Sequence, residues 1–314
     1  MTDPNPIAYL RALGCYLPER IVDNAEIGPI AGADPAWILQ MTGIAQRRFA
    51  GPRETVATMG LLAAQDCLSS VRASARDVGL ILAASGSGER RFPGPASEIG
   101  AALGIGGVPA IDLPMASAGS LFGMALAAQL APVYGNVLVV ASEIMSRVIH
   151  LHPTGRDTAI LFGDGAGACL IGADAGPARI ADSVLHTDGE FAEILTLYCD
   201  TPLHMDGRSV ILQASRKMPR AIAELLERNG RTASEIAAFL MHQANLNLMT
   251  RVANALGVPE QRFFRNLDRY GNTSSASLLI AAAEWWKGQD GVWPGPVVFA
   301  AFGAGLNWGA LLAV

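Results

Sequence analysis

The sequence predicts an α/β protein in which helices cover both faces of the sheet. Short aliphatic runs alternate with Ala- and Leu-rich segments of helical length, as in layered α/β folds. The runs at 80–82 and 137–140 have no polar alternation, which indicates strands buried on both faces. With 51% hydrophobic and 16% charged residues in 314, the chain can bury a large core, which excludes a disordered protein.

The strands are predicted, in chain order, at 79–84, 109–112, 137–141, 237–241 and 297–301. One region has a composition that a transmembrane helix could also have, because residues 113–142 carry no charge and ~20 apolar residues can span a bilayer. Pro132, Gly135 and Asn136 divide this region into a helix over 117–131 and a strand over 137–141. We therefore expect a buried helix beside a buried strand, and no membrane partner.

An internal echo predicts two similar halves. An acid-initiated strand at 76–82 is followed by the turn Phe162-Gly163-Asp164-Gly165, and another at 234–240 is followed by Phe302-Gly303-Ala304-Gly305. We expect a division into 1–172 and 173–314, with no low-complexity linker between the halves. A chance echo of Gly- and Ala-rich strands is the alternative.

Charge and cysteine content limit the partners. The net charge is −5 and Lys and Arg form no continuous run, so neither nucleic acid nor an anionic membrane is expected to bind. The four cysteines have no metal-ligand spacing, and residues 1–8 lack the pattern of a signal peptide. We expect a cytoplasmic protein with reduced thiols and no metal site.

Four segments carry residues suited to chemistry. Ser117 lies where a strand gives way to a long helix, and the unpaired N–H groups of a helix start favour a developing oxyanion. His242 follows a predicted strand, where ligands enter many α/β proteins. Asn272 lies in a polar turn before another helix, and Ala304 in a Gly-rich turn that allows close backbone approach. Each of these residues also has a structural interpretation: Ser117 as an N-cap, His242 as a structural histidine, and Asn272 as part of an Asx turn or cap.

Together these segments resemble the β-ketoacyl-acyl carrier protein synthase III family of the thiolase-like superfamily, over nearly the whole chain. The motifs occur in the family's order and spacing: Thr-Gly-Ile at 42–44 with Arg47 and Arg48, Phe-Gly-Asp-Gly-Ala-Gly at 162–167, His-Gln-Ala-Asn at 242–245 and Gly-Asn-Thr-Ser-Ser at 271–275. The resemblance implies a thiolase-like, five-layered α-β-α-β-α fold of two duplicated halves, a homodimer, and an acyltransferase that starts fatty acid or polyketide chains.

The resemblance also implies roles for single residues. His242 and Asn272 match the family's catalytic histidine and asparagine, and the N–H groups of Ser117 and Ala304 match its oxyanion hole. Trp37, Arg156, Phe92 and Asn245 are expected to bind substrate or coenzyme A, with Phe92 reaching across the dimer into the partner's acyl pocket. No cofactor is expected, since the coenzyme A thioester is a substrate.

The chain departs from the family where a serine, Ser117, occupies the place of the nucleophilic cysteine. A hydroxyl ionises far less readily than a thiol and needs a nearby base. Three interpretations remain open: a natural nucleophile activated by His242, a substitution that traps a substrate complex, or a loss of covalent chemistry. A second departure lies at 246–256, where Arg251 is the only cation near Asn247 and Asn254, which weakens the expected docking of an acidic carrier protein.

The expected reaction transfers an acyl group from acyl-CoA to Ser117 and condenses it with a malonyl thioester. Two alternatives are acyl transfer to a hydroxyl, amine or thiol without loss of CO₂, and a non-catalytic acyl-CoA-binding partner subunit. An α/β-hydrolase is disfavoured, because that fold places an acid between its serine and its histidine.

Overall fold

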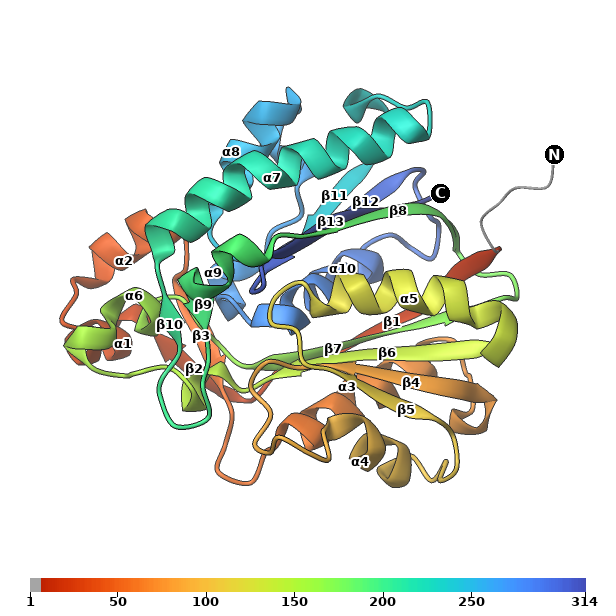
Figure 1. Ribbon diagram of the computed structural model, residues 1–314, viewed down its shortest axis with the longest axis horizontal. Coiled ribbons are helices and arrows are strands. Elements are labelled where there is room, and N and C mark those ends of the chain that lie inside the picture. The colour runs from red at the N-terminus through yellow and green to blue at the C-terminus, as the bar shows by residue number, and fades with distance from the viewer. Residues whose placement is uncertain (1–6) are drawn as a thin grey trace.

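The computed structural model describes residues 7–314, which form five layers of secondary structure (Figure 1). Helices occupy the outer and central layers, and strands occupy the two layers between them. The layer helices are α3 (Val56–Ser70) and α4 (Pro95–Ala102) at the bottom of Figure 1, α5 (Gly119–Tyr134) and α10 (Ser277–Lys287) in the centre, and α7 (Gly207–Arg228) and α8 (Leu246–Leu256) at the top.

The two strand layers join along one edge into a single nine-stranded sheet, as counted in residues 7–314. Its order is β11-β12-β13-β8-β1-β7-β6-β4-β5. The strands are β1 (Ala8–Tyr16), β4 (Val78–Ala84), β5 (Ala110–Leu113), β6 (Asn136–Glu143), β7 (Gly165–Gly172), β8 (Ala178–Thr187), β11 (Ala238–Met241), β12 (Val297–Gly303) and β13 (Asn307–Ala313).

The strand directions repeat from one layer to the other. In the lower layer β4 runs parallel to β6, and β6, β7 and β1 follow in antiparallel pairs. In the upper layer β11 runs parallel to β12, and β12, β13 and β8 follow in antiparallel pairs. The layers meet where β1 pairs with β8 through Ala8, Tyr9 and Leu10.

Smaller elements cover the end of the molecule at the left of Figure 1. Two small antiparallel sheets pair β2 (Arg20–Asp23) with β3 (Gln46–Phe49) and β9 (Leu195–Thr196) with β10 (His204–Met205). The short helices are α1 (Asn24–Ala31), α2 (Pro35–Thr42), α6 (Arg156–Ala159) and α9 (Leu267–Tyr270). Single 3₁₀ turns lie at η1 (Ala75–Asp77), η2 (Met145–Arg147), η3 (Pro153–Gly155), η4 (Gly189–Ile194), η5 (Ala233–Glu235), η6 (Glu260–Arg262) and η7 (Ser274–Ala276).

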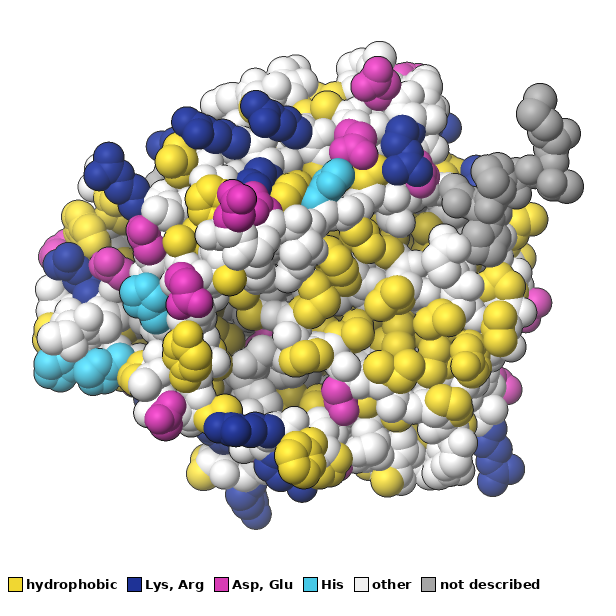
Figure 2. Space-filling model, viewed as in Figure 1, with side chains coloured by type: hydrophobic (Ala, Val, Ile, Leu, Met, Phe, Trp, Pro, Cys, Tyr) yellow, Lys and Arg dark blue, Asp and Glu magenta, His cyan; other side chains and the backbone are white. Residues whose placement is uncertain are grey.

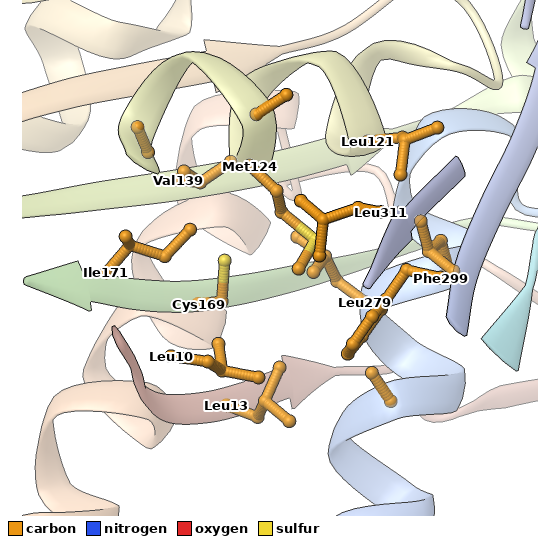
Figure 3. Close-up of a cluster of buried hydrophobic side chains, with 14 of the residues drawn as sticks. Leu10, Leu13, Leu121, Met124, Val139, Cys169, Ile171, Leu279, Phe299 and Leu311 are labelled. Carbon is orange, nitrogen blue, oxygen red and sulfur yellow. The ribbon is translucent and has the colours of Figure 1, made fainter. Parts of the chain in front are cut away.

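The central core lies between the two strand layers (Figure 3). Leu121 and Met124 of α5 and Leu279 of α10 pack against side chains from both layers, including Cys169 of β7 and Phe299 of β12. These five side chains are almost completely buried. Because one apolar cluster serves both strand layers, the two halves form one packed body.

Two helix starts near the site are fixed by side-chain caps. The Asp206 carboxylate accepts a hydrogen bond from Ser209 N–H at the start of α7, and Asn245 Oδ1 accepts one from Asn247 N–H at the start of α8. Helix α8 ends at Gly257, whose φ of 66° suits glycine. The caps therefore place the first turns of α7 and α8 beside the cavity described below.

All five predicted strands are present within one or two residues. The helix predicted over 117–131 differs at both ends: it begins at Gly119 and continues through Pro132 to Tyr134. Pro132 is tolerated because it lies in the last turn, where only one intrahelical hydrogen bond is lost. None of the helices formed by residues 7–314 combines the length and apolar character needed to cross a bilayer.

Candidate active site

Ser117 lies on a sharp turn between β5 and α5. Its φ of 62° is unusual for a residue with a side chain, and Ala118 N–H donates to Ala116 O across the turn at 2.7 Å. The N-cap of α5 is Ala118, so Ser117 does not cap the helix. Ser117 is 7% exposed and lines the largest of the cavities described here. The strained turn thus presents the hydroxyl to the cavity next to the positive end of α5.

His242 follows the last residue of β11 and lines the same cavity. Burial lowers the pKa of its imidazole to about 4, so the ring is neutral near pH 7. Nδ1 lies 2.5 Å from Ser277 Oγ, which also accepts a hydrogen bond from Gln243 N–H at 3.1 Å. A hydroxyl can either donate to Nδ1 or accept from Nδ1–H, so Ser277 supports both neutral tautomers.

Asn272 lies in the turn between α9 and η7, and its backbone is fixed against the 161–163 segment. Asn272 N–H donates to Leu161 O at 2.9 Å, and Gly163 N–H donates to Asn272 O at 3.0 Å. The side-chain Oδ1 accepts a hydrogen bond from Ser274 N–H at 2.9 Å. Because Oδ1 is occupied, the Nδ2 donor is the part of the carboxamide available to a ligand in the cavity.

The turns that carry Ser117 and Asn272 touch through a buried hydrogen bond. Ser117 N–H donates to Ser274 Oγ at 3.0 Å. Ser274 also has a positive φ, 48°, and is 1% exposed. Gly303 closes the opposite side: a Cβ there would lie 2.1 Å from Ala116 O and 3.0 Å from Ser117 Cβ. Only glycine fits at 303, so the Gly-rich turn approaches the Ser117 backbone directly.

A buried carboxylate holds the surrounding loops together. Glu143, at the end of β6, is 0% exposed and accepts hydrogen bonds from the backbone N–H groups of Gly86 and Ser87. Hydroxyl groups of Ser85 and Ser275 also donate to it. Glu143 therefore joins the loop after β4 to the turn that follows Asn272, which fixes the walls around Ser117.

The cavity has a volume of about 780 Å³ and runs from a buried end to an exposed end. Ser117, His242 and Asn272, each 5–7% exposed, lie at the buried end with Gly303. Apolar side chains line the middle, namely Ile160, Leu161, Phe162, Leu195, Val210, Ile211, Ala214 and Leu248. The size and the apolar lining suit an alkyl chain, whose burial contributes ~0.8 kcal/mol per methylene.

The exposed end brings together the residues expected to contact coenzyme A. The Arg156 guanidinium lies over the Trp37 ring, 5.5 Å from its centroid, and both side chains line the cavity. Met41 lines it beside them and is 45% exposed. Asn245 also lines the cavity, but its Nδ2 donates to Met41 O at 3.3 Å.

Two expected site residues do not line the cavity. Ala304 directly follows Gly303, which lines the cavity. The φ of Ala304 is not positive, as the expected role of its N–H as an oxyanion donor requires. Asn307 Nδ2 donates to Ala304 O at 2.5 Å, which fixes the turn. Phe92 lies on the loop before α4, is 84% exposed, and does not reach the cavity of its own chain. Within residues 7–314, His, Cys, Asp and Glu side chains form no cluster suited to a metal ion.

Sequence reasoning missed three supporting residues, Ser274, Ser277 and Glu143. The two serines lie in the segment interpreted as an Asx turn or cap, and neither spacing nor residue type indicates which backbone N–H or ring nitrogen they bind. Glu143 had a usable signal, because it is the first charge after thirty uncharged residues, 113–142. A carboxylate that ends a buried strand must be paired or hydrogen-bonded.

Comparisons with known proteins place the chain in one family. Residues 111–189 match the family "3-Oxoacyl-[acyl-carrier-protein (ACP)] synthase III", and residues 226–314 match the C-terminal region of the same family. A β-ketoacyl-acyl carrier protein synthase III of Vibrio vulnificus YJ016 is 36% identical over 308 residues, covering 95% of this chain and 96% of that protein. The corresponding protein of Pectobacterium atrosepticum is 38% identical over 311 residues, covering 95% and 96%.

Solved structures give the same result for the fold. The 3-oxoacyl-acyl carrier protein synthase III of Aquifex aeolicus VF5 has a TM-score of 0.93 and 31% identity, covering 98% of this chain and 99% of that one. The priming β-ketosynthase of the R1128 polyketide pathway has a TM-score of 0.91 and 31% identity, covering 100% and 98%. These matches confirm the predicted thiolase-like α/β fold, and the chain belongs to the 3-oxoacyl-acyl carrier protein synthase III family of acyltransferases.

Proposed function

We propose that this enzyme starts acyl chains by moving an acyl group from acyl-CoA to Ser117 Oγ and condensing it with a malonyl thioester. One observation carries the proposal: Ser117, His242 and Asn272, from three distant segments, line the buried end of a single cavity. The middle of that cavity then holds the pantetheine arm of coenzyme A, which runs from the thioester at Ser117 to the adenine end at Trp37 and Arg156.

In the first half-reaction, Ser117 Oγ attacks the thioester carbonyl carbon while its proton passes to Nε2 of the neutral His242. This step uses the tautomer in which Nδ1–H donates to Ser277 Oγ. The N–H groups of Ser117 and Ala304 stabilise the tetrahedral oxyanion, for which Ser117 N–H exchanges its bond to Ser274 Oγ. The C–S bond then breaks, and the coenzyme A sulfur takes the proton from His242.

In the second half-reaction, the malonyl C–C bond breaks and CO₂ leaves. His242 and Asn272 Nδ2 donate to the enolate oxygen, which now requires the tautomer with the proton on Nε2. The enolate carbon attacks the ester carbonyl and the C–O bond to Ser117 breaks. The serine oxygen takes up a proton from water, which is the one proton that the net decarboxylative condensation consumes. The Ser277 hydroxyl accommodates both half-reactions because it can accept from or donate to Nδ1.

The assembly that we propose is a homodimer formed along β5. This strand is the edge of the sheet, and Ile111 on it is 47% exposed. Hydrophobic side chains gather over the neighbouring α5, where Val133 is 76% exposed (Figure 2). An unpaired edge beside an apolar surface favours pairing with a second copy, across which Phe92 would reach the partner's cavity.

We also propose that the chain divides functionally at 172/173. Strand β7 ends at Gly172 and β8 begins at Ala178, and the repeated strand directions fall on either side. Residues 1–172 then supply Ser117, and residues 173–314 supply His242 and Asn272.

Intact-mass spectrometry with an acyl-CoA panel, followed by addition of malonyl thioester labelled in its free carboxyl group, tests the reaction. The expected result is one acyl mass on Ser117, absent in Ser117→Ala, followed by release of labelled CO₂. Acyl transfer to a hydroxyl, amine or thiol without release of labelled CO₂ would show that the enzyme is a simple acyltransferase and does not catalyse condensation. Binding of acyl-CoA without any acyl mass would instead identify a non-catalytic subunit.

A further inference from the structure

The turn between β12 and β13 carries the N–H of Ala304, an oxyanion donor in the proposed mechanism, but its own sequence gives it little rigidity. Ala304 lies between Gly303 and Gly305, and Gly305 has a φ of 130°. Glycine restricts the backbone less than any other residue. A donor stabilises a tetrahedral oxyanion effectively when it is held in place before the reaction. The orientation of Ala304 must therefore be fixed by contacts from outside this Gly-Ala-Gly segment.

The side chain of Asn307, the first residue of β13, folds back over the turn. Its Nδ2 donates to Ala304 O at 2.5 Å. A Cβ on residue 305 would lie 2.2 Å from Asn307 Nδ2, so the carboxamide occupies the space that a side chain at 305 would need. Gly303 pairs with Asn307 in the β12–β13 ladder. The peptide groups on both sides of the Ala304 Cα are therefore held through Asn307.

Thr187, the last residue of β8, holds the other end of the carboxamide. Thr187 lies opposite Asn307 in the β8–β13 pairing, and its hydroxyl donates to Asn307 Oδ1 at 2.7 Å. Ala304 O can only accept a hydrogen bond, so the carboxamide must present Nδ2 to it and Oδ1 to Thr187. Because both ends of the carboxamide are bonded, its rotation about the Cβ–Cγ bond is restricted.

The N–H of Ala304 remains available to a ligand. Within residues 7–314 it has no hydrogen-bond acceptor. The preceding residue, Gly303, lies against the Ser117 turn, since a Cβ there would be 3.0 Å from Ser117 Cβ. An unpaired donor thus lies next to the residue whose acylation passes through an oxyanion.

A second contact keeps the turn folded without the Asn307 side chain. The backbone of Leu306 exchanges two hydrogen bonds with that of Asp188, both 2.9 Å long. The Leu306 side chain is 0% exposed and belongs to the apolar cluster between the upper strands and α7. Shortening Asn307 should therefore loosen the orientation of Ala304 and leave the path of the chain intact.

We propose that Thr187 and Asn307 form a positioning pair that holds the Ala304 N–H in the orientation of an oxyanion donor. The inference rests on the proposed function. Neither side chain lines the cavity, so both act through Ala304 and contact no substrate. Loss of the pair should weaken binding of tetrahedral states and leave binding of the unreacted thioester unchanged.

The test compares two coenzyme A analogues that differ only in a carbonyl group. Trifluoroacetonyl-CoA, CF₃–CO–CH₂–S-CoA, can add Ser117 Oγ to its carbonyl carbon. In this step the serine proton passes to His242 Nε2, the carbonyl π bond breaks, and the oxyanion of the adduct faces the Ala304 N–H. Trifluoropropyl-CoA, CF₃–CH₂–CH₂–S-CoA, forms no adduct. Fluorine NMR detects the adduct, and titration gives the Kd of each analogue.

In Asn307→Ala, the Kd of trifluoroacetonyl-CoA should rise at least ~10-fold, which is less than the 10²–10³ expected from complete loss of a donor. The Kd of trifluoropropyl-CoA should stay within about twofold. The single-turnover rate of acylation at saturating acyl-CoA should fall by the same factor as the affinity for the ketone. Asn254→Ala, at an exposed position on α8, is the matched control and should change neither analogue.

Thr187 gives an independent check with a conservative partner. Thr187→Val removes the hydroxyl that holds Asn307 and should weaken the ketone selectively, by about threefold or more, whereas Thr187→Ser keeps the hydroxyl and should bind like wild type. Equal weakening of both analogues in Asn307→Ala would show a general structural role and overturn the proposal. Unchanged affinity for the ketone in Asn307→Ala would overturn it as well.

Failure of the proposed function has a different signature. Absence of the fluorine signal of the adduct in the wild-type protein would show that Ser117 is not a nucleophile, and would overturn the proposed function together with this inference. An adduct that forms in the wild type and is equally stable in Asn307→Ala would overturn the positioning pair alone.

Discussion

Two turns, each with a serine of positive φ, meet at the buried end of the cavity and have different roles. The first contains Ser117, with φ 62°, and precedes α5; the second contains Ser274, with φ 48°, and precedes α10. Ser117 lines the cavity, whereas Ser274 directs its hydroxyl to the N–H of Ser117. One turn therefore presents the proposed nucleophile, and the other supports the backbone that presents it.

The comparison shows where strain is useful. A positive φ costs a residue with a side chain about 1–2 kcal/mol, and the surrounding structure must hold it. Around Ser117 that support comes from Ser274, Gly303 and the loop fixed by Glu143. The second turn has its own support in Asn272 Oδ1, which accepts from Ser274 N–H. Asn272, which we propose contacts the substrate, thus also caps the supporting turn.

The largest effect should come from the first turn. Ser117→Ala should remove acyl mass completely and reduce condensation at least ~10³-fold, because the nucleophile is lost. Ser117→Cys should acylate faster than wild type, since a thiol ionises more readily. Mass spectrometry and product assay check both variants. Equal acylation of wild type and Ser117→Ala would show that Ser117 is not the nucleophile, and the two turns would then not differ in function.

Asn272→Ala should lower decarboxylative condensation by about 10²–10³-fold, the value of one preorganised donor. Acylation of Ser117 should fall much less, because the carboxamide acts on the enolate. Single-turnover acylation and labelled CO₂ release separate the steps. Asn272→Asp is the control for the cap on the second turn, because it keeps an oxygen acceptor for Ser274 N–H and removes the Nδ2 donor. Full condensation in Asn272→Asp would argue against a direct role for Asn272 Nδ2.

Removal of the supporting hydroxyl should affect stability more than rate. In Ser274→Ala, the buried Ser117 N–H loses its acceptor, which should lower the free energy of unfolding by about 1–3 kcal/mol. The acylation rate should change less than tenfold. Ser274→Gly removes the same hydroxyl but tolerates positive φ, so its difference from alanine in denaturant unfolding reports the backbone strain. Identical stability of the two variants would show that strain contributes nothing there.

The smallest effect should be that of mild acid on activity. Because burial lowers the pKa of His242 to about 4, acylation should change less than twofold between pH 8 and pH 6. The free energy of unfolding, in contrast, should depend on pH in this range. The unfolded chain binds a proton near pH 6.5 and the folded chain does not, so unfolding becomes easier as pH falls from about 6.5 towards 4. An acid limb in the acylation rate centred near pH 6.5 would contradict a neutral, buried ring.

Local patterns predicted the elements, and the resemblance predicted which residues meet. Unbroken aliphatic runs located β4, β6 and β12 to within two residues, because burial on both faces leaves a direct record in composition. The support around Ser117 was not predictable. Whether Ser274 takes a positive φ, and which donor its hydroxyl faces, depends on contacts between segments more than 150 residues apart.

The position of β1 has a consequence for synthesis of the chain. Strand β1 ends at Tyr16, but its two neighbours, β7 and β8, begin at Gly165 and Ala178. At about 5–20 residues per second, the ribosome exposes β1 for roughly ten seconds or more before either neighbour exists. Leu10 and Leu13, almost fully buried in the finished protein, cannot take their places in the completed sheet during that interval. Both edges of the amino-terminal strand therefore stay unpaired until about half of the chain has been made.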